Sequence, residues 1–139
     1  MISKPNPKST DPMMVLLVDD DPVDARLVLE YLDDAAPGRF QLVWVAHISD
    51  ALMEMGAKKF DAILLDLYLP DASGIQGYTR LARAVPQIPI IVLTGSEDVT
   101  IEKQLIGLGA RDYLRKGRFN GRLLTSVLVN WISLARASA

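Results

Sequence analysis

Short apolar runs and amphipathic stretches alternate along this chain. Runs of strand length occur at 14–19, 40–46, 62–65, 90–93 and 112–115. Between and after them, apolar residues recur three to four positions apart, the spacing of a helix with one buried face. We expect these helices around 22–35, 50–56, 75–82, 98–106 and 120–136. Regular alternation of strand and helix predicts an α/β domain with a parallel sheet and right-handed crossovers.

Polar residues predict where the first two helices begin. Asp21 can cap the first helix, and Pro22 suits its first position because the missing N–H has no helical partner there. Asp24, in the first turn, is expected to be a solvated acidic residue, as is Asp21. Ser49 or Asp50 is expected to cap the second helix. The first helix is expected to turn four side chains inward, those of Ala25, Val28, Leu29 and Leu32.

Length and composition bound the possible functions. The 139 residues fit one domain, half of them are apolar, and the formal net charge is −2. This charge offers no basic surface for direct nucleic-acid binding, and the lack of cysteine excludes disulfides and zinc–thiolate sites. Residues 1–12 carry three prolines and two lysines, which predicts a disordered leader before a domain at 13–139. We expect no membrane span and a cytoplasmic protein.

Polar groups stand at the ends of four predicted strands. Asp19 ends the first strand and Asp20 follows it, while Asp66 follows the third strand, Thr94 the fourth and Lys116 the fifth. Any one of them alone is best explained as a strand that leaves the core through a polar residue. Together they predict a site, because the carboxyl ends of parallel strands line the ligand crevice of an open α/β sheet.

An acidic cluster, a single Asp, a hydroxyl and a Lys, in this order, resemble the motifs of CheY-like response-regulator receiver domains over nearly the whole chain. The resemblance implies the flavodoxin-like (βα)5 fold of these two-component signalling modules, a doubly wound parallel sheet of five strands in the order 2-1-3-4-5. In that order the first and third strands are neighbours at the switch point. Asp19, Asp20 and Asp66 are then expected to meet in one crevice.

Three clustered carboxylates repel each other, so either their pKa values rise or a cation binds. Oxygen ligands without nitrogen or sulfur suit Mg²⁺. The resemblance implies Asp20 and Asp66 as direct Mg²⁺ ligands. It further implies that Asp19 acts through water and that the backbone carbonyl of Tyr68 completes the protein ligands.

The resemblance also implies a function. Asp66 is expected to accept a phosphoryl group from the phosphohistidine of a histidine kinase or phosphotransfer protein, with Lys116 and Thr94 contacting the new group. Tyr113 lies three residues before the lysine, where the family has an aromatic switch that moves inward with Thr94. The expected protein is a phosphorylation-controlled switch rather than a turnover enzyme, although it takes part in its own phosphotransfer and dephosphorylation. Its output surface is expected near the fourth helix, fifth strand and last helix.

Four positions need their own interpretation. Gly117 replaces the proline that commonly follows the family's lysine, so we expect no cis peptide and a looser loop. Ser73 stands where the family often has Asp, and either residue can cap the next helix. Tyr68 is expected to overhang the path of the water that attacks the phosphoryl group, which predicts slow dephosphorylation. His47, the only histidine, is interpreted as structural or exposed rather than as a relay residue.

Two other functions compete. An Mg²⁺-dependent phosphohydrolase with an aspartyl nucleophile has a second Asp two residues after the first, and Tyr68 at that position argues against it. A nucleotide- or flavin-binding domain has a glycine-rich phosphate loop after the first strand. The aspartates at 19–21 give that loop the wrong charge for a bare phosphate.

The last helix carries more apolar residues than one buried face uses. We expect an inward stripe of four residues, Leu124, Leu128, Trp131 and Ala135. Other apolar residues flank this stripe, with Leu123, Val127 and Leu134 on one side and Ile132 on the other. Together they span roughly half the circumference, more than the usual stripe. The excess is either buried within the monomer or predicts a homodimer or output-domain surface.

Overall fold

The computed structural model describes residues 11–72, 74–95 and 98–138. Ser73 and nearly all of the predicted leader lie outside these residues. Within them, strands and helices alternate as predicted. The strands are β1 (Met13–Val18), β2 (Phe40–Val45), β3 (Ala62–Asp66), β4 (Ile90–Thr94) and β5 (Asp112–Arg115). The helices are α1 (Pro22–Ala35), α2 (Ile48–Ala57), α3 (Ile75–Ala84), α4 (Val99–Gly107) and α5 (Gly121–Ala137).

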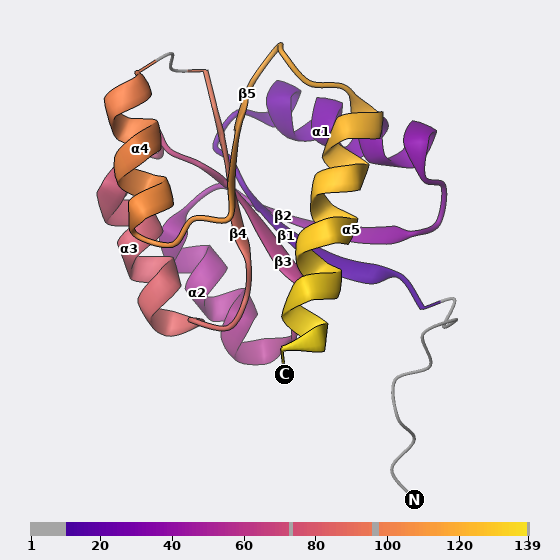
Figure 1. Cartoon of the computed structure of the whole chain (residues 1–139), viewed down its shortest axis with the longest axis horizontal. Helices are drawn as coiled ribbons and strands as arrows, with labels where there is room; N and C mark the ends of the chain where they lie inside the picture. The colour runs from indigo at the N-terminus through magenta and orange to yellow at the C-terminus, as the bar shows by residue number, and fades with distance from the viewer. Residues whose placement is uncertain (1–10, 73, 96–97, 139) are drawn as a thin grey trace, which may run out of the picture.

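The strands form one parallel sheet in the order β2-β1-β3-β4-β5, which confirms the expected doubly wound fold. Helices α1 and α5 cover one face, and α2, α3 and α4 cover the other (Figure 1). Alternate residues of each strand enter two apolar clusters, so that Leu16 and Val18 face one layer while Val15 and Leu17 face the other. Burial on both faces explains the continuous apolar runs of the central strands.

Helix α1 begins as predicted. The Asp21 carboxylate accepts a hydrogen bond from the Val23 N–H at 2.9 Å, and Pro22 is the first helical residue. The inward face is narrower than expected, because Leu29 is 43% exposed. Its buried residues are Ala25, Val28 and Leu32, and this stripe covers the sheet without Leu29.

Helix α2 is capped from a distance, so the prediction of a local cap at Ser49 or Asp50 was wrong. The helix starts at Ile48, and its N-cap residue, His47, makes no side-chain capping bond. Instead, the Asp71 carboxylate in the loop after β3 accepts hydrogen bonds from the N–H groups of Ile48 and Ser49, at 3.1 and 3.2 Å. This contact ties the loop that follows β3 to the start of α2.

The inward face of α5 also differs from the prediction. Leu124, Leu128 and Ile132 are buried, whereas Trp131 and Ala135 are only half-buried. The observed residues are four apart, and such rows form the ridges by which a helix packs. Of the excess apolar residues, Val127 is half-buried. The clearly exposed ones are Leu123 and Leu134, whose exposed fractions are 44% and 50%.

Helices α1 and α5 approach closely at Gly121. A Cβ atom at this position would overlap the backbone carbonyl of Tyr31 in α1. Asn120 caps α5 by accepting a hydrogen bond from the Leu123 N–H at 2.9 Å. No helix in the described part of the chain is long and apolar enough to cross a membrane.

Candidate functional site

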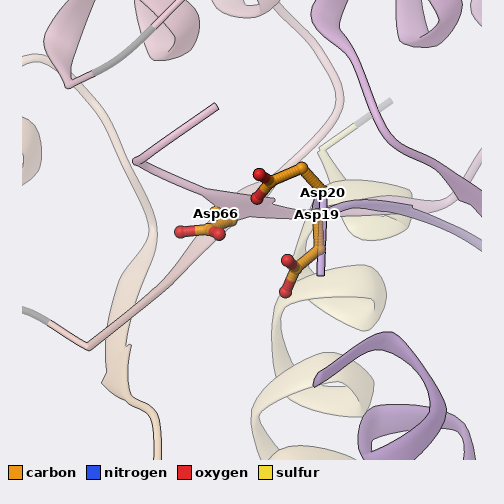
Figure 2. Close-up of side chains that lie close together, drawn as sticks. All are labelled: Asp19, Asp20 and Asp66. Atoms are coloured by element: carbon orange, nitrogen blue, oxygen red, sulfur yellow. The ribbon is translucent and has the colours of Figure 1, made fainter. Parts of the chain in front are cut away.

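The three predicted acidic residues meet at the carboxyl edge of the sheet. β1 and β3 are hydrogen-bonded neighbours, so Asp19 and Asp20, which follow β1, lie beside Asp66 at the end of β3. One carboxylate oxygen from each lies within 4.8 Å of the others (Figure 2). Asp19 and Asp66 are buried and Asp20 is exposed. The expected convergence of these side chains is therefore present.

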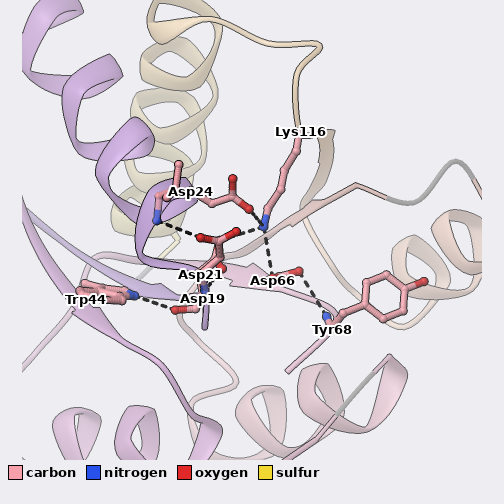
Figure 3. Close-up of polar contacts among 8 residues, drawn as sticks. Asp19, Asp21, Asp24, Trp44, Asp66, Tyr68 and Lys116 are labelled. Carbon is pink, nitrogen blue, oxygen red and sulfur yellow. Dashed lines mark hydrogen bonds and ion pairs between the residues drawn. The ribbon is translucent and has the colours of Figure 1, made fainter. Parts of the chain in front are cut away.

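Lys116 extends from the end of β5 into this acidic crevice (Figure 3). Its Nζ donates to Asp19 Oδ2 at 2.9 Å and to Asp66 Oδ2 at 3.2 Å. It also donates to Asp24 Oδ2 at 2.8 Å. The ammonium group has three N–H donors, and three carboxylates receive them.

The interpretation of Asp24 as a solvated residue was wrong. It lies in the first turn of α1, and this turn stands beside the crevice because α1 begins directly after the β1 loop. The available sequence signal was an acidic residue one helical turn beyond the strand end. Its partner is 92 positions away in the chain, so local spacing alone could not identify the contact.

Burial raises the pKa of Asp66 from its ordinary 3.8 to about 6. The nearby Lys116 charge and the Tyr68 N–H, which donates to Asp66 Oδ1 at 3.2 Å, oppose this effect without cancelling it. For Lys116, burial alone would lower the pKa, but hydrogen bonds to Asp24 and Asp19 and the charge of Asp66 raise it instead. At neutral pH the site therefore holds an ionised Asp66 beside a charged lysine.

Asp19 is held by several contacts besides Lys116. Its Oδ1 accepts a hydrogen bond from the Asp21 N–H at 3.0 Å. Its backbone carbonyl accepts one from the indole N–H of Trp44 in β2, at 2.6 Å (Figure 3). Sequence reasoning missed Trp44, because a half-exposed strand tryptophan carries no local sign of this contact. These bonds fix the backbone that carries Asp19 and Asp20.

Thr94 and Tyr113 occupy the β4–β5 side of the crevice. Thr94, the last residue of β4, is fully buried, and Tyr113 is 8% exposed. Burial raises the pKa of Tyr113, while the nearby Thr94 side chain opposes the shift. The two predicted switch residues are thus adjacent, with the tyrosine already turned inward.

Tyr68 and Gly117 border the site. The Tyr68 ring is 48% exposed and points away from the Asp66 carboxylate (Figure 3). Gly117 follows the lysine with φ of 82°, a conformation that favours glycine, and the described residues contain no cis peptide bond. The expected trans Lys–Gly linkage is present.

The donor set fits a hard divalent cation. Three carboxylates supply only oxygen ligands, and two of them are buried, so a bound Mg²⁺ would offset their mutual repulsion. The aspartates also disfavour a phosphate loop, which relies on backbone N–H groups. Two residues after Asp66, where a phosphohydrolase with an aspartyl nucleophile has its second Asp, this chain has Tyr68.

Known proteins share this sequence and architecture. The chain is 36% identical over 104 residues to the swarming motility regulation protein RssB of Serratia marcescens, and covers 46% of that protein. It is 32% identical over 105 residues to the cell cycle transcriptional regulator CtrA of Caulobacter vibrioides, of which it covers 44%. These matches take in 75% of this chain. The chain thus spans less than half the length of these two relatives.

Solved structures of receiver domains also match this chain. The signal receiver domain of a putative LuxO repressor protein from Vibrio parahaemolyticus matches with a TM-score of 0.80 and 28% identity, over 91% of this chain and 95% of that one. The receiver domain of the sensor histidine kinase PA1611 from Pseudomonas aeruginosa, with a magnesium ion in its active-site cleft, matches with a TM-score of 0.74 and 27% identity. That match covers 88% of this chain and 98% of the other.

The family model for the response regulator receiver domain matches residues 15–128. This span runs from β1 into α5 and includes every residue of the acidic crevice together with Lys116. The protein therefore belongs to the response regulator receiver domain family.

Proposed function

We propose that Asp66 accepts a phosphoryl group from the phosphohistidine of a histidine kinase or phosphotransfer protein. The observation that carries this proposal is the buried Asp66 carboxylate, which lies beside two further carboxylates and within 3.2 Å of the Lys116 ammonium. Membership of the receiver family supports it, because receiver domains are signalling modules that work with histidine kinases and output domains. The phosphoryl group then acts as a signal.

In the proposed transfer, an Asp66 carboxylate oxygen attacks phosphorus. The new O–P bond forms as the P–N bond of phosphohistidine breaks, and the histidine nitrogen keeps the electron pair. Such a reaction depends mainly on positioning and on neutralisation of charge. The Tyr68 N–H, which donates to Asp66 Oδ1, orients the carboxylate for this attack.

The acidic residues would have different roles in binding the cation. Asp20 and Asp66 would be direct Mg²⁺ ligands, Asp19 would act through a water molecule, and the Tyr68 carbonyl would supply a further oxygen. When bound, Mg²⁺ would neutralise part of the negative charge of the phosphoryl oxygens. The hydrogen bonds that hold Asp19 in place keep this edge of the site ready for the cation.

Lys116 and Thr94 would contact the transferred group. The ammonium that now binds Asp66 Oδ2 would donate to a phosphoryl oxygen, and the Thr94 hydroxyl would donate to another. A shift of Thr94 changes the packing of Tyr113, because the two side chains are neighbours. This coupling would carry the signal to the surface of α4, β5 and α5, where a partner or output domain reads it.

Intact-protein mass spectrometry tests the proposal. Acetyl phosphate or phosphoramidate with Mg²⁺ should add one phosphoryl group to the wild type and none to Asp66→Asn, because an amide cannot form the acyl phosphate. Asp21→Asn is a matched control, since Asn preserves the helix cap and leaves the acceptor intact. Stoichiometric labelling of Asp66→Asn would show that the acceptor is elsewhere.

A further inference from the structure

The contact between Asp24 and Lys116 gives the lysine a partner outside the cation site. The candidate ligands are Asp19, Asp20 and Asp66; Asp24 stands outside this trio. Its distance to the ammonium, 2.8 Å, is the shortest of the three lysine contacts. The Asp24 side chain is 35% exposed, against 1% for Asp19 and 8% for Asp66.

The other two contacts place Lys116 in competition with a cation. Its ammonium binds one oxygen each of Asp19 and Asp66, and these carboxylates are two of the three that would face Mg²⁺. A positive group held firmly between them raises the cost of bringing a second positive charge to the same oxygens. The position of the ammonium therefore affects how well the crevice takes up a cation.

We propose that Asp24 is a positioning residue that draws the Lys116 ammonium toward α1 and so keeps the carboxylates of Asp19 and Asp66 available to a divalent cation. The first turn of α1 suits this role, because the positive end of the helix dipole stabilises a carboxylate there. The inference rests on the proposed function for the identity of the cation. Asp24 itself contributes no ligand and acts through the lysine.

Removal of the Asp24 charge should weaken cation binding. In Asp24→Asn the lysine keeps two charged partners among the described residues, Asp19 and Asp66, and both belong to the proposed cation site. The ammonium then competes more strongly with the metal. We expect the dissociation constant for Mg²⁺ to rise about three- to fivefold, the effect of one partly exposed ion pair. Asp21→Asn removes the same charge from the same segment without touching the lysine contact, and should change the constant by less than about twofold.

The test is an Mg²⁺ titration followed through backbone amide NMR shifts, at constant ionic strength and at a pH well above the pKa of Asp66. The wild type, Asp24→Asn and Asp21→Asn are compared, and each change is repeated in a Lys116→Met background. If Asp24 acts through the lysine, Asp24→Asn should weaken binding no more than Asp21→Asn does in that background. Asp24→Glu should restore part of the affinity.

Two results of this titration would overturn the role of Asp24. Equal effects of Asp24→Asn and Asp21→Asn with the lysine present would overturn the inference, as would an Asp24→Asn effect that persists without the lysine. The amide spectra also show whether each variant is folded, which separates a structural role from a positioning one. A wild type that takes up no Mg²⁺ in the crevice would instead refute the cation site of the proposed function.

Discussion

The raised pKa of Asp66 predicts that ionisation of this residue destabilises the metal-free protein. The pKa is 3.8 in an ordinary environment and about 6 in the fold, so between these values the folded protein binds more protons than the unfolded chain. Stability is therefore lost as the pH rises through this window. At about 1.36 kcal/mol per tenfold change in proton affinity, the ionised carboxylate costs about 3 kcal/mol at pH values above the window.

Asp66→Asn removes this cost because the amide has nearly the same shape and no charge. In EDTA, the free energy of unfolding of the variant should equal that of the wild type at pH values below this window. The variant should become the more stable protein as the pH rises, by about 3 kcal/mol at pH values above the window. That gain corresponds to roughly 10 °C in melting temperature. Lys116 keeps Asp19 and Asp24 as partners in the variant, so its charge stays compensated.

Urea denaturation at a series of pH values measures this difference. Asp21→Asn serves as the control, because it removes a charge from an exposed residue and retains the cap. Added Mg²⁺ should stabilise the wild type and narrow its gap to Asp66→Asn, since a cation relieves the buried charge. A gap that is independent of pH, or Asp66→Asn falling below the wild type at high pH, would refute burial of the charge as the cause.

Three further changes probe other parts of the molecule. Gly121→Ala should destabilise the fold by about 2 kcal/mol in thermal unfolding, because its Cβ would meet the Tyr31 carbonyl. The control Gly56→Ala should not destabilise the fold, because a Cβ there would face open space among the described residues. Equal losses of stability in the two variants would contradict this reasoning. Tyr68→Ala should lose its phosphoryl group faster if the exposed ring rotates over the acceptor, and an unchanged rate would exclude shielding. Leu134→Glu should weaken any self-association in sedimentation without unfolding, whereas unchanged association would place the contact elsewhere.

The strands and the main site residues could be predicted because their signals are local. An apolar run that ends in a polar residue marks both a buried strand and the edge at which it stops, as at Asp66 and Thr94. The strand order came only from family resemblance, because periodicity does not state which strands are neighbours. That order is what brings the first acidic residues beside Asp66.

The predictions that failed concern contacts between distant segments or fine helical geometry. Asp71 caps α2 and Asp24 binds Lys116 across separations that no local pattern encodes. On α5, Trp131 was assigned inward by alternating steps of three and four, whereas the helix packs along a row of steps of four that reaches Ile132. A stripe drawn from spacing alone cannot choose between these neighbouring rows.

The crevice brings together residues from distant parts of the chain, since Lys116 and Asp19 are 97 positions apart. A polypeptide emerging from the ribosome would present its acidic residues long before β5 and the lysine exist. Such a partial chain has the carboxylates but lacks the lysine ammonium that balances their charge. The acidic crevice can therefore be completed only after synthesis has passed β5 and the residue that follows it.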